Sequence, residues 1–391
     1  MFDYPLPYWL ISLVATLLSL VGCGSVSYYA QSLNGQLELL ANREAISTII
    51  DDPDTPGELK QQLELVLQMR QFASNELSLP DNGSYKNYAD LNREYVVWNV
   101  FAAPEFSLEP VTWCYLVVGC LSYRGYFSED SADEYAESLR KQGYDVFVGG
   151  VTAYSTLGWF DDPVLNTMLQ WSDTRIAKVI FHELAHQKLY IRDDTAFNEA
   201  FADTVAQEGV CRWLEAHGTA NIQHHFHLEE VREAQFVTLV LKIRTRLDAL
   251  YSSERLPVEK RAMKATIFDD MRTDYVKLKS RWNGYDAYDS WFASDLNNAK
   301  LAAVATYREY IPAFQTMLEE ASENLETFYQ RAAALGALSE GERDAKLNRM
   351  LARSLHRAAP HRPHTSSASA QSCYPCTDGS CLEVSAPRTY G

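Results

Sequence analysis

The stretch FHELAHQKLYIRDDTAFNEAFAD, residues 181–203, constrains this chain more than any other part of its sequence. Helical spacing places His182 and His186 one turn apart on one face of a helix, with Glu183 beside them. The pattern H-E-x-x-H combines two metal-binding imidazoles with a carboxylate that can reach a water molecule in an open coordination position. The segment therefore predicts a helix that carries a metal site.

A second helix is predicted to return to this site. Asp194 or Thr195 can act as its N-cap after the turn RDD, and the helix then presents Glu199 to the two histidines. Two histidines and one glutamate with an open position form a catalytic rather than a structural set of zinc ligands. Asp203, one turn after Glu199, can accept the free N–H of a ligand histidine. The alternative is that Glu199 and Asp203 lie on an ordinary solvated acidic face.

Composition limits the partners of the chain. Its 391 residues are 47% hydrophobic, which is enough for one large or two ordinary domains with a buried core. With 35 basic and 52 acidic residues, the formal net charge is -17. Such a surface does not neutralise phosphates, so we expect no nucleic-acid partner.

The N-terminus carries an uninterrupted apolar run at residues 8–22. Its length suits the core of a signal peptide and is short for a membrane-spanning helix. The run ends in LVGC, which resembles the bacterial lipobox and would make Cys23 the lipidated first residue. The preceding MFDYPLP has no Lys or Arg and carries Asp3, unlike a usual signal peptide. An uncleaved membrane anchor and a buried helix are the alternatives.

Apolar periodicity and β-branched residues predict an α+β, predominantly α-helical chain. The strands are expected between about 93 and 160, around a helix that begins near SADEY. The expected parts are a signal peptide or anchor at 1–22, a helical region at 23–92, an α+β lobe with an edge strand at 93–172, a helical zinc-binding lobe at 173–337 and a disordered tail at 338–391.

Two cysteines, Cys114 and Cys120, are close enough in sequence to close a small disulfide loop. An oxidising compartment favours this pairing, whereas a cytosolic protein would favour two buried thiols in a strand. The disulfide prediction therefore depends on export.

Several motifs together resemble a known family. HELAH followed by NEAFAD is similar to the gluzincin metallopeptidases, with a shorter spacing than in thermolysin-like enzymes. A closer resemblance, over roughly residues 20–335, is to the bacterial predicted-aminopeptidase family of exported, lipobox-bearing zinc proteins; its motifs here are TWCYLVVGC, YRGYF, GGVTAYSTLGWFDDPVL, HELAHQ, NEAFAD and NNAKLAAVATYREYIPAF. The resemblance implies a zincin-like fold, a peptide substrate and a place in the bacterial cell envelope as an exported lipoprotein.

A role in peptide hydrolysis is predicted for each residue of the site. His182, His186 and Glu199 would hold Zn2+, and Glu183 would act as general base toward a water molecule. A tyrosine would stabilise the oxyanion. Tyr307 and Tyr154 are the candidates, with Tyr285 and Tyr288 behind them.

The segment 148–163, just before the metal-binding helix, has the composition of an edge strand that could pair with an extended peptide. An ordinary strand and turn is the alternative. Aminopeptidase activity is the preferred hypothesis and endopeptidase activity comes next. The rival is a non-catalytic envelope scaffold or binding lipoprotein that keeps zinc for stability. The carboxylate of Glu183 favours catalysis, because a structural site does not need it.

Overall fold

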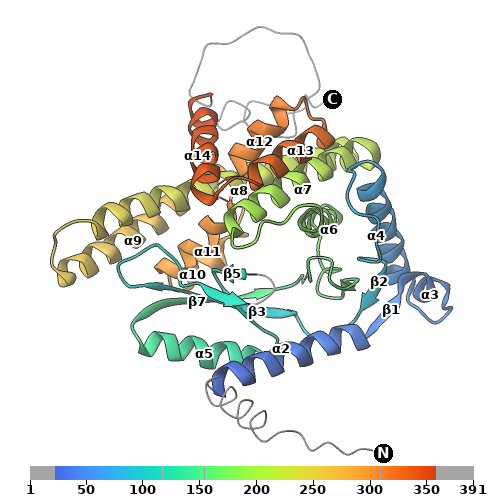
Figure 1. Ribbon diagram of the computed structural model, residues 1–391, viewed down its shortest axis with the longest axis horizontal. Helices are drawn as coiled ribbons and strands as arrows, with labels where there is room; N and C mark the ends of the chain where they lie inside the picture. The colour runs from blue at the N-terminus through green and yellow to red at the C-terminus, as the bar shows by residue number, and fades with distance from the viewer. Residues whose placement is uncertain (1–22, 116–118, 154, 309, 358–391) are drawn as a thin grey trace, which may run out of the picture.

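The computed structural model describes residues 23–115, 119–153, 155–308 and 310–357. Helices dominate the described residues, together with three small sheets (Figure 1). The chain is therefore α+β and mainly helical, as the sequence predicts. Within the described residues, no helix is both long and apolar enough to cross a membrane. The predicted signal segment at 1–22 lies outside them.

The N-terminal part contains strands as well as the expected helices: α2 (Cys23–Ala41), β1 (Arg43–Ala45), α3 (Ile46–Asp51), α4 (Gly57–Asn75) and β2 (Asn87–Ala89). β1 pairs antiparallel with β2, and β2 pairs parallel with the distant strand β8 (Val164–Leu165). The region predicted as helical at 23–92 thus contains three helices and, in addition, two short strands. β1 and β2 have three residues each, too few to show a strand period in the sequence.

A second sheet separates two helices. Its antiparallel strands lie in the order β6 (Arg124–Tyr126), β3 (Val97–Pro104) and β7 (Tyr144–Val151). Alternate side chains of a strand face opposite sides. Val100 and Ala102 therefore pack on one face with α5 (Glu129–Lys141), while Phe101 and Ala103 pack on the other with α11 (Asn298–Arg308). Beside this sheet in sequence lies the hairpin of β4 (Trp113–Tyr115) and β5 (Gly119–Leu121).

β7 is an edge strand of this sheet. It pairs with β3 from Pro104–Tyr144 to Val97–Val151. An edge strand is predicted for residues 148–163, and within the described part of this segment only residues 148–151 are strand. The rest contains a turn held by the buried Asp162, whose carboxylate accepts hydrogen bonds from the backbone and hydroxyl of Thr156.

The helical part of the molecule is arranged around one central helix. Its helices are α6 (Asp173–Lys188), α7 (Thr195–His217), α8 (Ala220–Tyr251), α9 (Pro257–Arg281), α10 (Asp289–Ala293), α11, α12 (Ile311–Glu320) and α13 (Leu325–Gly336). The central helix is α7, in which residues 200–211 are buried without a break. α6, α11 and α12 pack around it. α8 and α9 form the long antiparallel pair that the sequence predicts around SSERLP (Figure 1).

The helical structure continues past residue 337. α14 (Glu340–Arg357) lies in the segment for which a disordered tail is predicted, so that prediction is wrong for these residues. Leu347 is buried in the main core, and Met350 and Leu351 pack against it at helical spacing. The Arg, His, Ser and Ala content of the chain end hides this short apolar stripe. Residues 358–391 lie outside the described residues.

Candidate active site

The first half of the site lies on α6. Ser172 is the N-cap of this helix and accepts a hydrogen bond from the backbone N–H of Arg175. One turn separates His182 from His186, and their Nε2 atoms lie 3.0 Å apart. The two side chains are only 17% and 6% exposed, so both imidazoles are inside the molecule.

The second half lies on α7, whose first turn is held by side chains. Asp194 is the N-cap and accepts a hydrogen bond from the backbone N–H of Phe197 at 3.0 Å. Asn198 accepts a hydrogen bond from the N–H of Ile191 and donates one to its carbonyl, each at 2.7 Å. Asn198 thereby closes the turn between the two helices and fixes the position of the next residue, Glu199, relative to the two histidines. No sequence pattern indicates this role, because it depends on the backbone of Ile191.

The structure brings the three predicted ligands together. Oε2 of Glu199 lies 3.2 Å from Nε2 of His182 and 3.7 Å from Nε2 of His186. One donor atom from each of the three residues can therefore contact the same ion, and the group could hold a metal ion. The ligands come from two helices that pack against each other, so the site is built into the core of the molecule.

The electrostatics of this group favour a cation. Burial opposes a charge on His182, but Asp203 and Glu199 outweigh it and raise the pKa of the imidazole well above its usual range. Burial would raise the pKa of Glu199, yet His186 and His182 hold it down at about 2. Groups that stabilise a positive imidazole in this way also stabilise a metal cation placed between them.

Asp203 fixes the tautomer of one histidine. Its Oδ1 lies 3.1 Å from Nδ1 of His182. An ionised carboxylate only accepts hydrogen bonds, so the proton of a neutral His182 lies on Nδ1 and the lone pair of Nε2 points toward Glu199. Burial would raise the pKa of Asp203, but Arg308 and His182 hold it well below its usual range.

Behind Asp203 lies an ionic network that the sequence does not reveal. Arg308 of α11 reaches Asp203 at 3.3 Å with one nitrogen and Glu233 of α8 at 2.5 Å with the other. Lys178 of α6 contacts Glu233 at 3.1 Å and Glu230 at 2.6 Å. Four helices, α6, α7, α8 and α11, are thus linked behind His182. Local sequence patterns cannot show contacts between residues more than 50 positions apart.

A cavity of about 1350 Å³ opens beside the metal-binding group. Glu183 lines it together with the three ligands. The end of β7 lines it as well, through Gly150 and Val151. Further walls come from α2 (Tyr28 and Tyr29), from the β4–β5 hairpin (Tyr115 and Leu121), from α8 (Glu229), and from Trp171 and Arg175 around the start of α6. The cavity therefore brings the strand region, the two site helices and the N-terminal helix to one place.

The structure describes the predicted tyrosines to different extents. Tyr154 lies outside the described residues, and Tyr307 belongs to α11 with its side chain outside the described part. Tyr285 and Tyr288 line the cavity. So does Tyr190, whose ring centroid is 6.3 Å from that of the second ligand histidine. Tyr190 follows that histidine by four residues but lies beyond the end of α6 at Lys188, so helical spacing does not predict its position.

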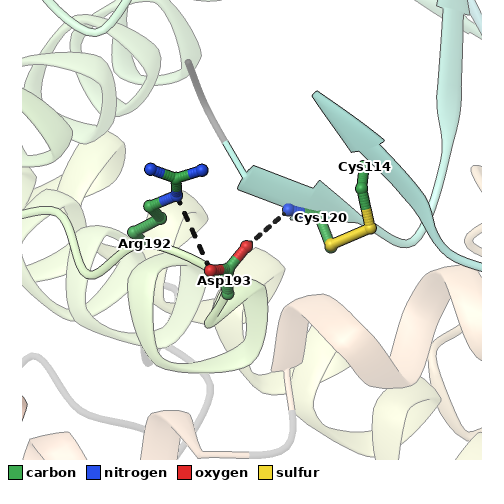
Figure 2. The surroundings of a disulfide bond; sticks show 4 residues. All are labelled: Cys114, Cys120, Arg192 and Asp193. Atoms are coloured by element: carbon green, nitrogen blue, oxygen red, sulfur yellow. Dashed lines mark hydrogen bonds and ion pairs between the residues drawn. A yellow bond between two sulfur atoms is a disulfide. The ribbon is translucent and has the colours of Figure 1, made fainter. Parts of the chain in front are cut away.

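A disulfide lies against the turn between the two site helices (Figure 2). Cys114 and Cys120 are opposite each other in the β4–β5 hairpin and are bonded. The backbone N–H of Cys120 donates to Oδ1 of Asp193 at 2.7 Å, and Asp193 also contacts Arg192 at 3.7 Å. Because Leu121 lines the cavity, the hairpin joins the cavity wall to the turn that positions α7.

Comparison with known proteins identifies one family. The family model described as "Putative aminopeptidase" matches residues 27–347, a range that contains all the side chains of the site. No curated protein and no solved structure gives a significant match. Since the match extends over most of the chain, from α2 into α14, the protein belongs to the putative aminopeptidase family, and this membership implies peptidase activity.

Proposed function

We propose that this protein is a zinc-dependent peptidase, by preference an aminopeptidase, in which Glu183 is the general base. The observation that carries the proposal is the convergence of His182, His186 and Glu199 beside Glu183 in one large cavity. A structural zinc site needs no additional carboxylate and no cavity. Family membership supports peptidase chemistry independently of this geometry.

The donor set suits zinc. Four tetrahedral ligands at about 2.0–2.1 Å from zinc lie about 3.3 Å from one another. The separations of the three donor atoms, 3.0, 3.2 and 3.7 Å, bracket this value. Two imidazole nitrogens and one carboxylate oxygen are also a common catalytic zinc set, which leaves one position open.

The side chains of the site have distinct tasks in peptide hydrolysis. Bound zinc would polarise the scissile carbonyl and lower the pKa of a water molecule. Glu183, next to His182 and lining the cavity, would take the proton of the attacking water and pass it to the leaving amine. Asp203 would hold the tautomer of His182. An oxyanion donor is also needed, and Tyr190 joins the four tyrosines predicted for this task.

The substrate would bind along β7. An extended peptide can add to the free edge of a sheet through its backbone hydrogen bonds. β7 is an edge strand, and its last residues, Gly150 and Val151, line the cavity that holds Glu183. The backbone of a strand added here would lie beside the proposed metal-binding group.

We also propose that the protein is exported and anchored to the membrane of the cell envelope by a lipid on Cys23. The apolar run at 8–22 and the lipobox-like LVGC support the anchor. The Cys114–Cys120 disulfide supports export, because disulfides persist in oxidising compartments. Cys23 is the first residue of α2, so the anchor would be directly joined to the folded part.

The test compares the parent protein with Glu183→Gln for zinc content and for cleavage of aminoacyl and N-blocked peptides. General-base catalysis contributes about 10²–10⁴-fold, so the variant should lose cleavage by that factor while it retains zinc. Glu208→Gln is the control, because Glu208 lies on α7 but pairs with Arg212 away from the ligands. This control should cleave like the parent.

The outcome separates three functions. Cleavage that is lost on N-blocking of the peptide identifies an aminopeptidase, and cleavage that survives N-blocking identifies an endopeptidase. If parent and variant both hold zinc and neither cleaves any peptide of the panel, the peptidase proposal is refuted in favour of a zinc-stabilised scaffold.

A further inference from the structure

The helix α2, the first within the described residues, has an exposed apolar face. Tyr29, Leu33 and Leu37 are spaced by four residues, and they are 51%, 60% and 53% exposed. With 100° per residue, these three and the exposed Ala30 and Ala41 fall within an arc of about 120°. We call these five residues the apolar face of α2.

Polar and buried residues border this face. Asn34 and Glu38 are also exposed and lie at its rim, and Glu38 pairs with Arg93 of the neighbouring chain segment at 3.4 Å. On the opposite side of the helix, Leu39 is buried and Gly35 lies directly against the ring of Phe127. α2 is thus packed on the molecule by one side and presents an uncharged apolar stripe on the other.

We propose that the apolar face of α2 lies on the membrane surface, a proposal that rests on the proposed anchor at Cys23. α2 begins at Cys23 and follows the apolar run at 8–22 without a break. A helix rises 1.5 Å per residue, so an anchored helix start keeps Tyr29 within about 9 Å and Leu37 within about 21 Å of the bilayer. Helices with one apolar face bind in the plane of the interface.

The chemistry of the face selects a neutral lipid surface. The five residues carry no charge, and the protein as a whole has a formal net charge of -17. Anionic headgroups would repel such a protein, so binding must come from apolar contact. It should therefore occur on phosphatidylcholine and persist at high salt.

This placement has a consequence for the active site. Tyr28 and Ser32, on the inner side of α2, line the cavity that contains Glu183, and so does Tyr29 at the edge of the apolar face. α2 would then form the wall between the cavity and the bilayer. Peptide substrates at the membrane surface would be close to the catalytic residues.

The test uses the protein that begins at Cys23 and carries its lipid, in phosphatidylcholine vesicles that contain a lipid with a photoactivatable group in its acyl chain. After illumination, lipid adducts are mapped on peptides by mass spectrometry. We expect adducts on residues 29–41 as well as on the N-terminal segment next to the anchor, residues 23–28, at low and at high salt. Leu33→Asp/Leu37→Asp should lose the adducts on 29–41 and retain the N-terminal ones.

A matched control comes from the α8–α9 hairpin. Leu256 and Val258 are 64% and 66% exposed, so Leu256→Asp/Val258→Asp makes the same change on another exposed apolar pair. This variant should keep all adducts. Equal thermal unfolding midpoints would show that both double variants are folded.

Two results would overturn the proposal. Adducts confined to the N-terminal segment would leave the anchor intact and remove α2 from the membrane, whether the face is then open to water or covered by a second copy of the chain. A lipidated protein that does not bind the vesicles would refute both the membrane position of α2 and the anchor. Neither result bears on peptide cleavage by the Glu183 site.

Discussion

At the scale of single residues, Asp203 connects the metal-binding group to the rest of the core. It contacts His182 with one oxygen and Arg308 with the other. Carboxylates that orient a ligand histidine typically contribute 10- to 100-fold to metal affinity. We therefore expect Asp203→Asn to weaken zinc binding by about 10–100-fold, measured by competition with a chromophoric chelator.

The matched control for this change is again Glu208→Gln, an acid-to-amide change on the same helix. Its zinc affinity should equal that of the parent protein. An unchanged affinity in Asp203→Asn would show that the hydrogen bond to His182 does not orient the ligand.

Asp162 gives a prediction for pH. Burial raises the pKa of its carboxyl from 3.8 to about 6, against the hydrogen bonds from Thr156. The folded protein therefore holds this proton more tightly than the unfolded chain, and the resulting stabilisation, complete below pH 3.8, is lost as pH rises through 6. A pKa shift of this size corresponds to about 3 kcal/mol in the free energy of unfolding. Solvent screening reduces this value only slightly, because Asp162 is 2% exposed.

Asp162→Asn removes this titration. The free energy of unfolding of the parent minus that of the variant should fall by about 2 kcal/mol between pH 4 and pH 6.5. Urea denaturation at several pH values measures this difference. A difference that stays constant with pH would mean that the carboxyl has an ordinary pKa in the folded protein.

The residues of the site differ in how far sequence can reveal them. His182, His186 and Glu199 are close in sequence, and helical spacing is enough to place them on two faces that can meet. Arg308 and Glu233 reach the site from helices far along the chain, and only tertiary packing brings them there.

At the scale of elements, the β4–β5 hairpin is held by its disulfide and by Asp193. Closing a loop of this length restricts the unfolded chain and contributes about 2 kcal/mol in the chain-entropy model. We expect Cys114→Ser/Cys120→Ser to lower the free energy of unfolding by that amount. Reduction of the parent protein should have the same effect, and a reductant should not change the stability of the double variant. Equal stability of oxidised and reduced parent would contradict the prediction.

Elements with a strong pattern were predicted well, and the exceptions have physical causes. The α8–α9 pair has many turns of helical periodicity, and β3 is rich in β-branched and aromatic residues. α14 has only a narrow apolar stripe and depends on contacts with the core, including the ion pair of Arg343 with Asp194. β7 ends at Val151 because the following residues form the turn around Asp162.

At the scale of the whole molecule, a bound metal would join α6 to α7, the two helices at the centre of the main core. A ligand that binds only the folded state stabilises it by RT ln(1 + [L]/Kd), which is about 2.7 kcal/mol at 100 times Kd. We expect free zinc at that concentration to raise the free energy of unfolding by this amount, and chelation to reverse it, as measured by urea denaturation.

Two variants separate the ligands from the proposed general base. Glu199→Gln removes a charged ligand, so it should lose most of the stabilisation by zinc, whereas Glu183→Gln should keep all of it because Glu183 is not among the three ligands. If Glu183→Gln also lost the zinc effect, Glu183 would be a ligand and could not serve as the base. If zinc stabilised Glu199→Gln as strongly as the parent, the third ligand would have to be another residue of the cavity.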